Sequence, residues 1–324
     1  MAVWLVRRLA ASIAIVFAVL TLTFFIVHLA RGSPCGPSQE RPFPPEVCDT
    51  LIRQFGLDKP LWVQYVRYLR ELARGNLGQS FVLHRPVADA LADALPRTFV
   101  LALAALLIDF SLGLALGIYQ AVRERRFADI ALGNVALFIN SMPTFWLGLV
   151  LLLVFAQRLH WFPPGGLSDP VLCPQLASGY CFLNFLWHLA LPALTLGLVG
   201  AAATARYQRA AMLEVIRQDY VRTARAKGLG ERRVVLVHTV RNALLPFITL
   251  FGLAFPFLLT GAVLIETVFS WPGMGWLAVN AFLQRDYPVV SAAALVASGM
   301  VVLGNLLADV LYAGADPRIR VPGA

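Results

Sequence analysis

Six long apolar runs constrain the fold of this chain more than any other feature. Each run is long enough to cross a hydrocarbon core of about 30 Å, which takes about 20 helical residues. A segment in lipid must satisfy its backbone hydrogen bonds internally, so each run is predicted to be a helix. The sequence therefore predicts an all-α membrane protein with six transmembrane helices: Leu9 to Ala30, Thr98 to Val122, Ile130 to Gln157, Phe182 to Ala205, Asn242 to Ile265 and Tyr287 to Ala308.

Composition and charge distribution agree with a membrane protein. Only 14% of the residues are charged, whereas soluble domains carry about 25%. The net charge of +9 comes from basic clusters between the runs, which is typical of cytoplasmic loops. We therefore expect a multi-pass protein with both termini in the cytoplasm. Nucleic-acid binding is disfavoured, because no basic stripe is interleaved with aromatic residues.

The runs divide the chain into four predicted parts. Residues 1–30 form the first transmembrane helix, which we expect to stay uncleaved because it is longer than a signal-peptide core and no A-x-A site follows. Residues 31–97 form an external segment, and residues 98–315 a five-helix core that includes the cytoplasmic loop 206–241. Residues 316–324 form a cytoplasmic tail.

The external segment is predicted to contain amphipathic helices. After Pro60, apolar residues recur at helical spacing from Leu61 to Leu72, and arginines occupy the opposite side. Such a helix lies at the membrane interface or packs on the ends of the bundle, and both arrangements remain open. A second short helix, from Val87 to Leu95, is predicted to lead into the second span.

Four cysteines fall in pairs within the two predicted external segments, and no CxxC spacing occurs. We predict the disulfides Cys35–Cys48 and Cys173–Cys181, because each pair shares one short loop in an oxidising compartment. Unpaired small residues are the alternative.

Motifs for catalysis or metal binding are missing from the sequence. Neither lysine, Lys59 or Lys227, lies in a GxxxxGK[ST] loop, and no HExxH or GxSxG motif occurs. The chain is therefore predicted not to be an enzyme, to have no catalytic residue or metal site and to bind no cofactor. If it takes part in active transport, another subunit must hydrolyse ATP.

Several polar residues within or beside the runs are candidates for a pore. Asp109 lies in the second run, where it either faces a pore, pairs helices or is a structural residue, since an ionisable group in hydrocarbon is unfavourable. Asn140 and Pro143 either kink the third span along a path or hold helices together. Glu266 lies at the end of a run, where an acid anchored at the interface is expected.

The segment between the fourth and fifth runs, Glu214 to Pro246, is long, basic and helix-forming. A connecting loop alone would be shorter. Small residues at Ala224, Ala226 and Gly228 separate the charged ones and would permit close approach of another protein. We interpret it as a cytoplasmic docking helix, with a plain positive-inside anchor as the alternative.

The motifs DYVRTARAKGLG from Asp219 and HTVRNALLP from His238 resemble the cytoplasmic signature of permease subunits in the dipeptide and oligopeptide family of ABC importers. This chain has Arg222-Thr223-Ala224 where ABC importers at large show Glu-Ala-Ala, a variant that is common in the peptide branch. Further similar motifs cover nearly the whole chain in order: GLDKPLWVQYVRYL from Gly56, GNLGQSF from Gly75, PVADAL from Pro86, LPRT from Leu95, SMPTFWLGL from Ser141, ETVFSWPGMGWL from Glu266, RDYPVV from Arg285 and DPRIR from Asp316.

The resemblance implies a type I ABC importer permease of the bacterial or archaeal cytoplasmic membrane that moves short peptides. Its expected partners are a second homologous permease, two ATPase subunits that bind ATP and Mg, an external solute-binding protein and membrane lipid. Nickel complexes, glutathione or oligosaccharides are alternative solutes, and a self-sufficient channel or a signalling subunit is an alternative from another class.

By this resemblance, a coupling helix would contact an ATPase, and an external loop from Glu266 to Leu277, including Trp271, would lie near the pore mouth. Asp109 and the cysteine pairs are not part of the family signature. The expected coupling residues are Asp219, Tyr220, Arg222, Thr223, Ala224, Arg225, Ala226, Lys227 and Gly228.

Overall fold

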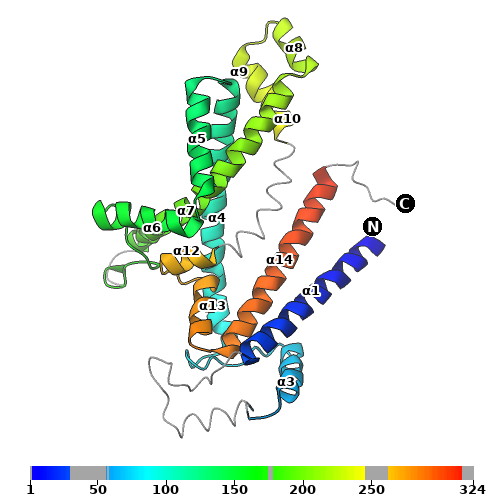
Figure 1. Ribbon diagram of the computed structural model, residues 1–324, viewed down its shortest axis with the longest axis vertical. Coiled ribbons are helices and arrows are strands. Elements are labelled where there is room, and N and C mark those ends of the chain that lie inside the picture. The colour runs from blue at the N-terminus through cyan, green and yellow to red at the C-terminus, as the bar shows by residue number, and fades with distance from the viewer. Residues whose placement is uncertain (1, 30–55, 57, 174–177, 245–261, 316–324) are drawn as a thin grey trace. The chain divides into compact units, whose positions relative to one another are not determined.

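The computed structural model describes residues 2–29, 56, 58–173, 178–244 and 262–315, and it is built from helices (Figure 1). The chain divides into two compact units. Unit 1 contains Met1–Pro96 and Gly273–Val302, and unit 2 contains Arg97–Pro272 and Leu303–Ala324. Two long helices, α4 (Val87–Val122) and α14 (Tyr287–Ala315), contribute residues to both units.

In unit 1, α1 (Ala2–Leu29) packs against the amphipathic helix α3 (Leu61–Ala73). The hydroxyls of Thr21 and Tyr65 are hydrogen-bonded at 2.7 Å, and the ring of Tyr65 lies 5.2 Å from that of Phe24. The predicted helix after Pro60 is therefore present, and it packs on the end of an apolar helix. The exposed Trp62 shows that α3 also keeps an apolar surface outside this contact.

A buried carboxylate organises the turn that follows α3. Asp286, at 1% exposure, accepts hydrogen bonds from the Ser80 hydroxyl and from the backbone N–H groups of Phe81 and Val82. The Ser80 oxygen in turn accepts the Leu83 N–H at 2.8 Å. These bonds satisfy backbone groups that a turn leaves without ladder partners.

The core of unit 1 lies between the first turns of α4, α13 (Met274–Leu283) and the first half of α14. The predicted short helix from Val87 is continuous with α4, although Pro96 lies inside it. The buried side chains are all small or aliphatic, which lets these helices pack closely: Val87, Ala90, Leu91, Ala94, Met274, Leu277, Ala281, Val289, Ala292 and Ala293.

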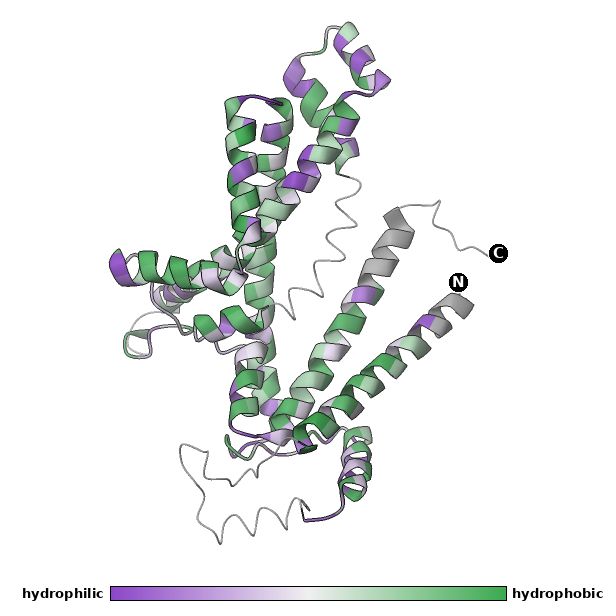
Figure 2. Cartoon of the chain, viewed as in Figure 1, coloured by the Kyte–Doolittle hydropathy of each residue, from purple (hydrophilic) through white to green (hydrophobic). Residues whose placement is uncertain are grey.

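Unit 2 is built around α4 and α7 (Ser178–Ile216), with α5 (Phe127–Ser141) beside α7. At 1.5 Å per residue, the 36 residues of α4 and the 39 of α7 reach about 54 and 58 Å. Both exceed the hydrocarbon thickness of about 30 Å, and Figure 2 shows hydrophilic residues on α7 toward α8. The predicted loop 206–241 thus begins as a continuation of α7, up to Ile216.

The third predicted span is bent by 105° between α5 and Thr144–Arg158, as Figure 1 shows at α6 (Thr144–Leu151). Met142 is extended at φ −83° and ψ 142°, because a residue that precedes proline disfavours the α region. Pro143 then begins the next helix, which continues as the π-helix η1 (Leu152–Arg158). The predicted kink at this proline is confirmed.

Glycines allow the backbones of α4 and α7 to approach closely. A Cβ placed at Gly117 would lie 2.6 Å from the Gln208 Cβ, and one at Gly197 would lie 2.6 Å from the Ile108 Cβ. Small residues of this kind are typical of helix contacts in membranes. Gly113 and Gly200 complete the set, facing Thr204 and Asp109.

Four helices among the described residues are long and apolar enough to span a membrane, and the bent pair makes a fifth. They correspond to the first, second, third, fourth and sixth predicted runs. Most of the predicted fifth span, Asn242 to Ile265, lies outside the described residues. Its first residues lie in α10 (Val240–Ala243) and its last in α12 (Val263–Val268).

Candidate functional site

The predicted coupling segment folds into a helical hairpin at the end of α7 (Figure 1). Its first helix, α8 (Asp219–Ala226), is followed by α9 (Glu231–Arg233) and by the π-helix η3 (Val234–Thr239). Gly228 ends the first helix with φ +76°, a left-handed conformation that favours glycine after a helix C-terminus. Its N–H donates to the Arg225 carbonyl at 2.9 Å.

A small apolar core holds this hairpin together. Val221, Ala224 and Val234 are buried against one another, with Ile216 and Leu229 packed around them. The expectation that Ala224 offers a small surface to another protein therefore changes: its side chain points into the core of the segment. Ala226, by contrast, is exposed as expected.

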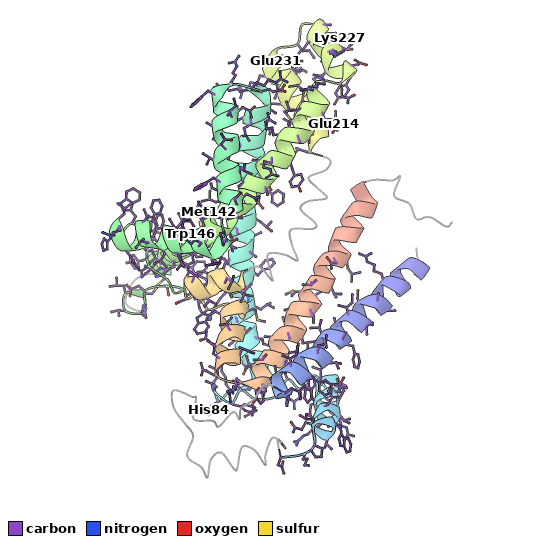
Figure 3. All side chains as sticks on the ribbon, in the orientation of Figure 1. His84, Met142, Trp146, Glu214, Lys227 and Glu231 are labelled. Carbon is purple, nitrogen blue, oxygen red and sulfur yellow. A yellow bond between two sulfur atoms is a disulfide. The ribbon has the colours of Figure 1, made fainter. Side chains whose placement is uncertain are left out.

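The outer surface of α8 is polar and exposed. The Asp219 side chain is 97% accessible and lies 3.5 Å from Arg222, and Lys227 stands at the tip beside Gly228 (Figure 3). Thr223 is also exposed, and its hydroxyl donates to the Asp219 carbonyl at 2.9 Å. This surface offers several cations around few acids, which suits an acidic or polar partner surface.

An ion pair closes the hairpin from outside. Arg225 donates to Glu231 through Nη2 at 2.6 Å and through Nε at 3.1 Å. This contact lowers the pKa of Glu231 and raises that of Arg225. Arg225 is thus engaged within the segment. Tyr220 is engaged too, because its hydroxyl accepts a bond from Asn242 at 2.9 Å.

The sequence reasoning missed two further ion pairs, one between α7 and the first turn of α5 and one between the residue after α7 and the turn between α4 and α5. Arg209 donates to both carboxylate oxygens of Asp129, at 2.7 and 2.8 Å. Asp129 also accepts the Arg125 N–H at 3.0 Å. Nearer the hairpin, Arg217 donates to Glu124 at 2.9 Å. The one signal available was the isolated acid Asp129 at the edge of an arginine-rich loop.

The predicted external loop is held to α4 by buried polar contacts within unit 2. Thr98 donates to Glu266 at 2.6 Å, and the indole N–H of Trp271 donates to the Arg97 carbonyl at 3.1 Å. Arg97 in turn donates to the Pro272 carbonyl at 3.3 Å. Glu266 and Trp271 are both fully buried. Glu266 is therefore bonded inside the protein, and its place at the membrane interface stays a prediction.

Asp109 lies where α4 approaches α7. Gly200 of α7 faces its carboxylate without a side chain. The Oδ1 atom is buried and accepts no hydrogen bond from the described part of the chain. Of the interpretations left open, this geometry favours helix pairing, because the carboxylate lies in a contact between two helices.

The polar residues of the bent span are exposed. Asn140, Ser141 and Pro143 are all exposed, and Figure 3 marks the bend beside them with the labels Met142 and Trp146. The Ser141 hydroxyl donates to the Leu137 carbonyl at 2.8 Å. These residues therefore shape the bend in this chain, and a pore-lining role for them stays a prediction.

The structure joins Cys173 and Cys181 by a disulfide with a Cα–Cα distance of 5.1 Å. The second predicted pair, Cys35 and Cys48, lies outside the described residues. Within residues 58–173, 178–244 and 262–315, no cluster of His, Cys, Asp or Glu has the arrangement of a metal site.

Long apolar helices, a bent span and an exposed basic hairpin define the chain as a multi-pass membrane protein. A model of the family described as "Binding-protein-dependent transport system inner membrane component" matches residues 113–321. A model of the N-terminal part of such components matches residues 1–102. The chain therefore belongs to the family of binding-protein-dependent transport system inner membrane components, and works with other subunits.

Relatives cover nearly the whole chain. It is 42% identical over 330 residues to the di/tripeptide transport system permease protein DppB of Pseudomonas aeruginosa, with 98% of each chain covered. It is 38% identical to the oligopeptide transport system permease protein AppB of Bacillus subtilis, with 99% of this chain and 100% of the relative covered. The glutathione transport system permease protein GsiC of Escherichia coli is 39% identical, with 98% of each chain covered.

Proposed function

We propose that this chain is one of two homologous permease subunits of an ATP-driven importer of short peptides. The observation that carries the proposal is the 42% and 38% identity, over nearly the full chain, to permeases named for di/tripeptides and oligopeptides. An external solute-binding protein delivers the peptide, and two ATPase subunits bind ATP and Mg. The chain itself performs no chemistry and forms half of the path.

The mechanism is alternating access. A loaded binding protein docks outside, and ATP closes the ATPase dimer inside. The exposed surface of α8 seats in an ATPase groove and passes this closure to the permease pair. The Arg225–Glu231 pair and the core of Val221, Ala224 and Val234 stiffen the hairpin, so that a push on its tip moves α7 rather than deforming the loop.

Glutathione is a second candidate solute, supported by the 39% identity to GsiC. Glutathione is itself a tripeptide with a free ammonium and free carboxylates, so one pathway chemistry suits both solutes. Uptake by the importer reconstituted in vesicles separates them: we expect saturable, ATP-dependent uptake of di- and tripeptides. Uptake of glutathione with no competition from Ala-Ala would contradict the peptide assignment, and ion conductance by the chain alone would indicate a channel.

The docking role of α8 is tested by Ala226→Trp, which enlarges an exposed side chain at the tip. The variant is expected to fold, because Ala226 is outside the core of the hairpin. It should lose ATPase association, since overpacking a contact is unfavourable by about 1 to 3 kcal/mol. Ala92→Trp, the same change at an exposed position of α4, is the matched control. If both variants transport at the parental rate, α8 is only an anchor.

The orientation proposed places both termini and α8 in the cytoplasm and α3 outside. Arginine-rich stretches at 123–126 and 206–241 support this arrangement. Single cysteines at the exposed positions Arg70 and Ala226, in a cysteine-free background, report it in intact cells. An impermeant reagent should label position 70 alone, and labelling of position 226 would reverse the topology.

A further inference from the structure

A cavity of about 470 Å³ lies within unit 1, between α1, α3, residues 76–81 and the first turn of α14. Figure 1 shows these elements gathered around the end of α1. All of the lining residues belong to unit 1, so the cavity is separate from the coupling hairpin. Its walls combine aromatic rings, amide side chains and two side chains of opposite charge: Phe24, Tyr68, Tyr287, Asn76, Arg67 and Glu71.

One wall of the cavity is aromatic. The ring of Phe24 is stacked on His28 at 4.0 Å and on Tyr68 at 5.4 Å, and Tyr287 lies 5.1 Å from His28. Faces of such rings attract cations, and ammonium groups in particular. Burial, with a smaller contribution from Tyr65, raises the pKa of Tyr68 to about 12. Its hydroxyl therefore stays neutral and able to donate a hydrogen bond.

The cavity lining also includes a cation and an anion that lie one helical turn apart on α3. Arg67 and Glu71 both line the cavity from α3, and residues four apart lie on the same face of a helix. Asn76 donates to one oxygen of the Glu71 carboxylate at 2.9 Å, and the exposed Arg74 lies 3.4 Å from the other. Among the residues that the structure describes, Arg67 forms no ion pair, so its guanidinium is available to an anion.

These features fit a zwitterion whose ammonium and anionic groups are a few bonds apart. A carboxylate beside aromatic rings receives the ammonium group, and arginine is well suited to phosphate because its fork donates two parallel hydrogen bonds. Phosphoethanolamine has this arrangement, with two carbons between its amine and its phosphate ester. A dipeptide shares the same two charges.

The surroundings favour a lipid over a free solute. Beside the cavity, α1 exposes large apolar side chains along its length, including Phe17, Leu22 and Ile26, which suit acyl chains. Trp62 is 69% exposed on α3, and tryptophan is enriched at the level of lipid headgroups. An amphipathic helix that meets the end of an apolar helix therefore places this cavity at the membrane interface.

We propose that the cavity binds the headgroup of phosphatidylethanolamine, with the ammonium group against Glu71 and the aromatic wall and the phosphate against Arg67. The acyl chains lie along the apolar surface of α1. This proposal concerns unit 1 alone, and it holds whichever solute the transporter carries.

The test uses the full-length chain, purified from membranes with the subunits that accompany it and placed in detergent micelles. Dioleoyl phosphatidylethanolamine is titrated in, and bound lipid is counted by native mass spectrometry. Arg67→Gln and Glu71→Gln should each weaken binding about tenfold, as expected for loss of one hydrogen bond to a charged group. Arg70→Gln, on α3 but outside the cavity lining, is the matched control and should bind as the parent does.

Three results would overturn the proposal. Equal binding of phosphatidylethanolamine by the parent and by both cavity variants would show that the charges do not recognise it. Equal affinity for dioleoyl phosphatidylglycerol, which lacks an ammonium group, would show that the cavity does not recognise the ammonium group. Displacement of the lipid by Ala-Ala at an affinity that depends on Arg67 and Glu71 would assign the cavity to a soluble peptide. If one variant fails to assemble, the other still makes the comparison with Arg70→Gln.

Discussion

Replacing Asp129 by asparagine should destabilise unit 2 by about 3 kcal/mol, because the change removes the buried counter-charge of Arg209. The Asp129 side chain is only 4% exposed, whereas Arg209 is 33% exposed. Breaking a buried pair destabilises a protein by about 3 to 5 kcal/mol, and partial access of water to Arg209 places this pair at the low end. The asparagine side chain keeps an oxygen that can accept the Arg125 N–H. The loss of stability therefore measures the ion pair with Arg209 and not the loss of that hydrogen bond.

The measurement is a double-mutant cycle on the full-length chain, with unfolding in a denaturing detergent followed by tryptophan fluorescence. Asp129→Asn, Arg209→Gln and the double variant give the coupling energy of the pair, which we expect to be about 1.5 kcal/mol or more. The exposed pair of Glu124 and Arg217, with accessibilities of 32% and 64%, is the matched control. Its coupling should stay below about 1 kcal/mol.

Additive effects at Asp129 and Arg209 would refute this reasoning. So would a coupling energy no larger than that of Glu124 and Arg217. Either outcome would mean that the two short contacts at 2.7 and 2.8 Å add no more to stability than an exposed ion pair does.

Three further predictions concern local contacts. Ala224→Glu should open the coupling hairpin, because the substitution buries a carboxylate in an apolar core. Opening would be seen as faster proteolysis of the hairpin in the variant than in the parent. Equal rates of proteolysis would contradict the packing of Ala224. The Arg225–Glu231 pair depresses the pKa of Glu231 below its ordinary value of 4.5, so the pair stabilises the hairpin above pH 4.5 and stops doing so as the pH falls through the depressed pKa. A spin label at position 226 should become more mobile over that fall in pH. The same transition in a Glu231→Gln variant would refute the role of this pair. Cys173 and Cys181 are eight residues apart, so reduction of their disulfide should lower local stability by about 2.5 kcal/mol in the chain-entropy model. The melting temperature should fall on reduction, and Cys173→Ser should lower it in the same way. An unchanged melting temperature would contradict a stabilising role for the disulfide.

Features set by local sequence were predictable. Apolar length marks a span regardless of its neighbours, so five runs correspond to long or paired helices. The extended residue before Pro143 follows from proline sterics, and the helix after Pro60 follows from its periodicity. None of these conclusions requires knowledge of which helix lies beside which.

Features that depend on helix pairing were not predictable. Arg209 and Asp129 are 80 positions apart, and no property of either residue selects the other. Glu266 was expected at the membrane interface because it ends an apolar run, yet Thr98, far away in the sequence, bonds to it in a buried position. In both cases the partner residue comes from another helix. A single sequence does not show which helices pack together.

The burial of Ala224 lies between these cases, because a local signal was present. Val221 and Ala224 are three residues apart and lie on one face of α8, while Arg222, Thr223 and Arg225 beside them are polar or charged. This spacing is the pattern of a short amphipathic helix with a buried face. Reading small residues only as a surface for close approach overlooked the simpler role of filling a small core.

The contacts of α4 suggest how a push on the coupling hairpin would travel through unit 2. At one end of the unit, Arg97 and Thr98 bind Trp271 and Glu266 of the predicted external loop. Further along, glycines bring α4 within contact of α7, and at the far end Gln120 donates to the Asp129 carbonyl at 3.2 Å.

Hydrogen bonds and close helix contacts at several positions along α4 therefore join it to the external loop, to α5 and to α7. Most of these contacts are buried. Packed interiors transmit displacement because they have little free volume in which to deform. A force applied at α8, which follows directly on α7, would then displace these elements together rather than bend any one of them. Rigid rotation of such a block is the form of motion that alternating access requires of a permease subunit.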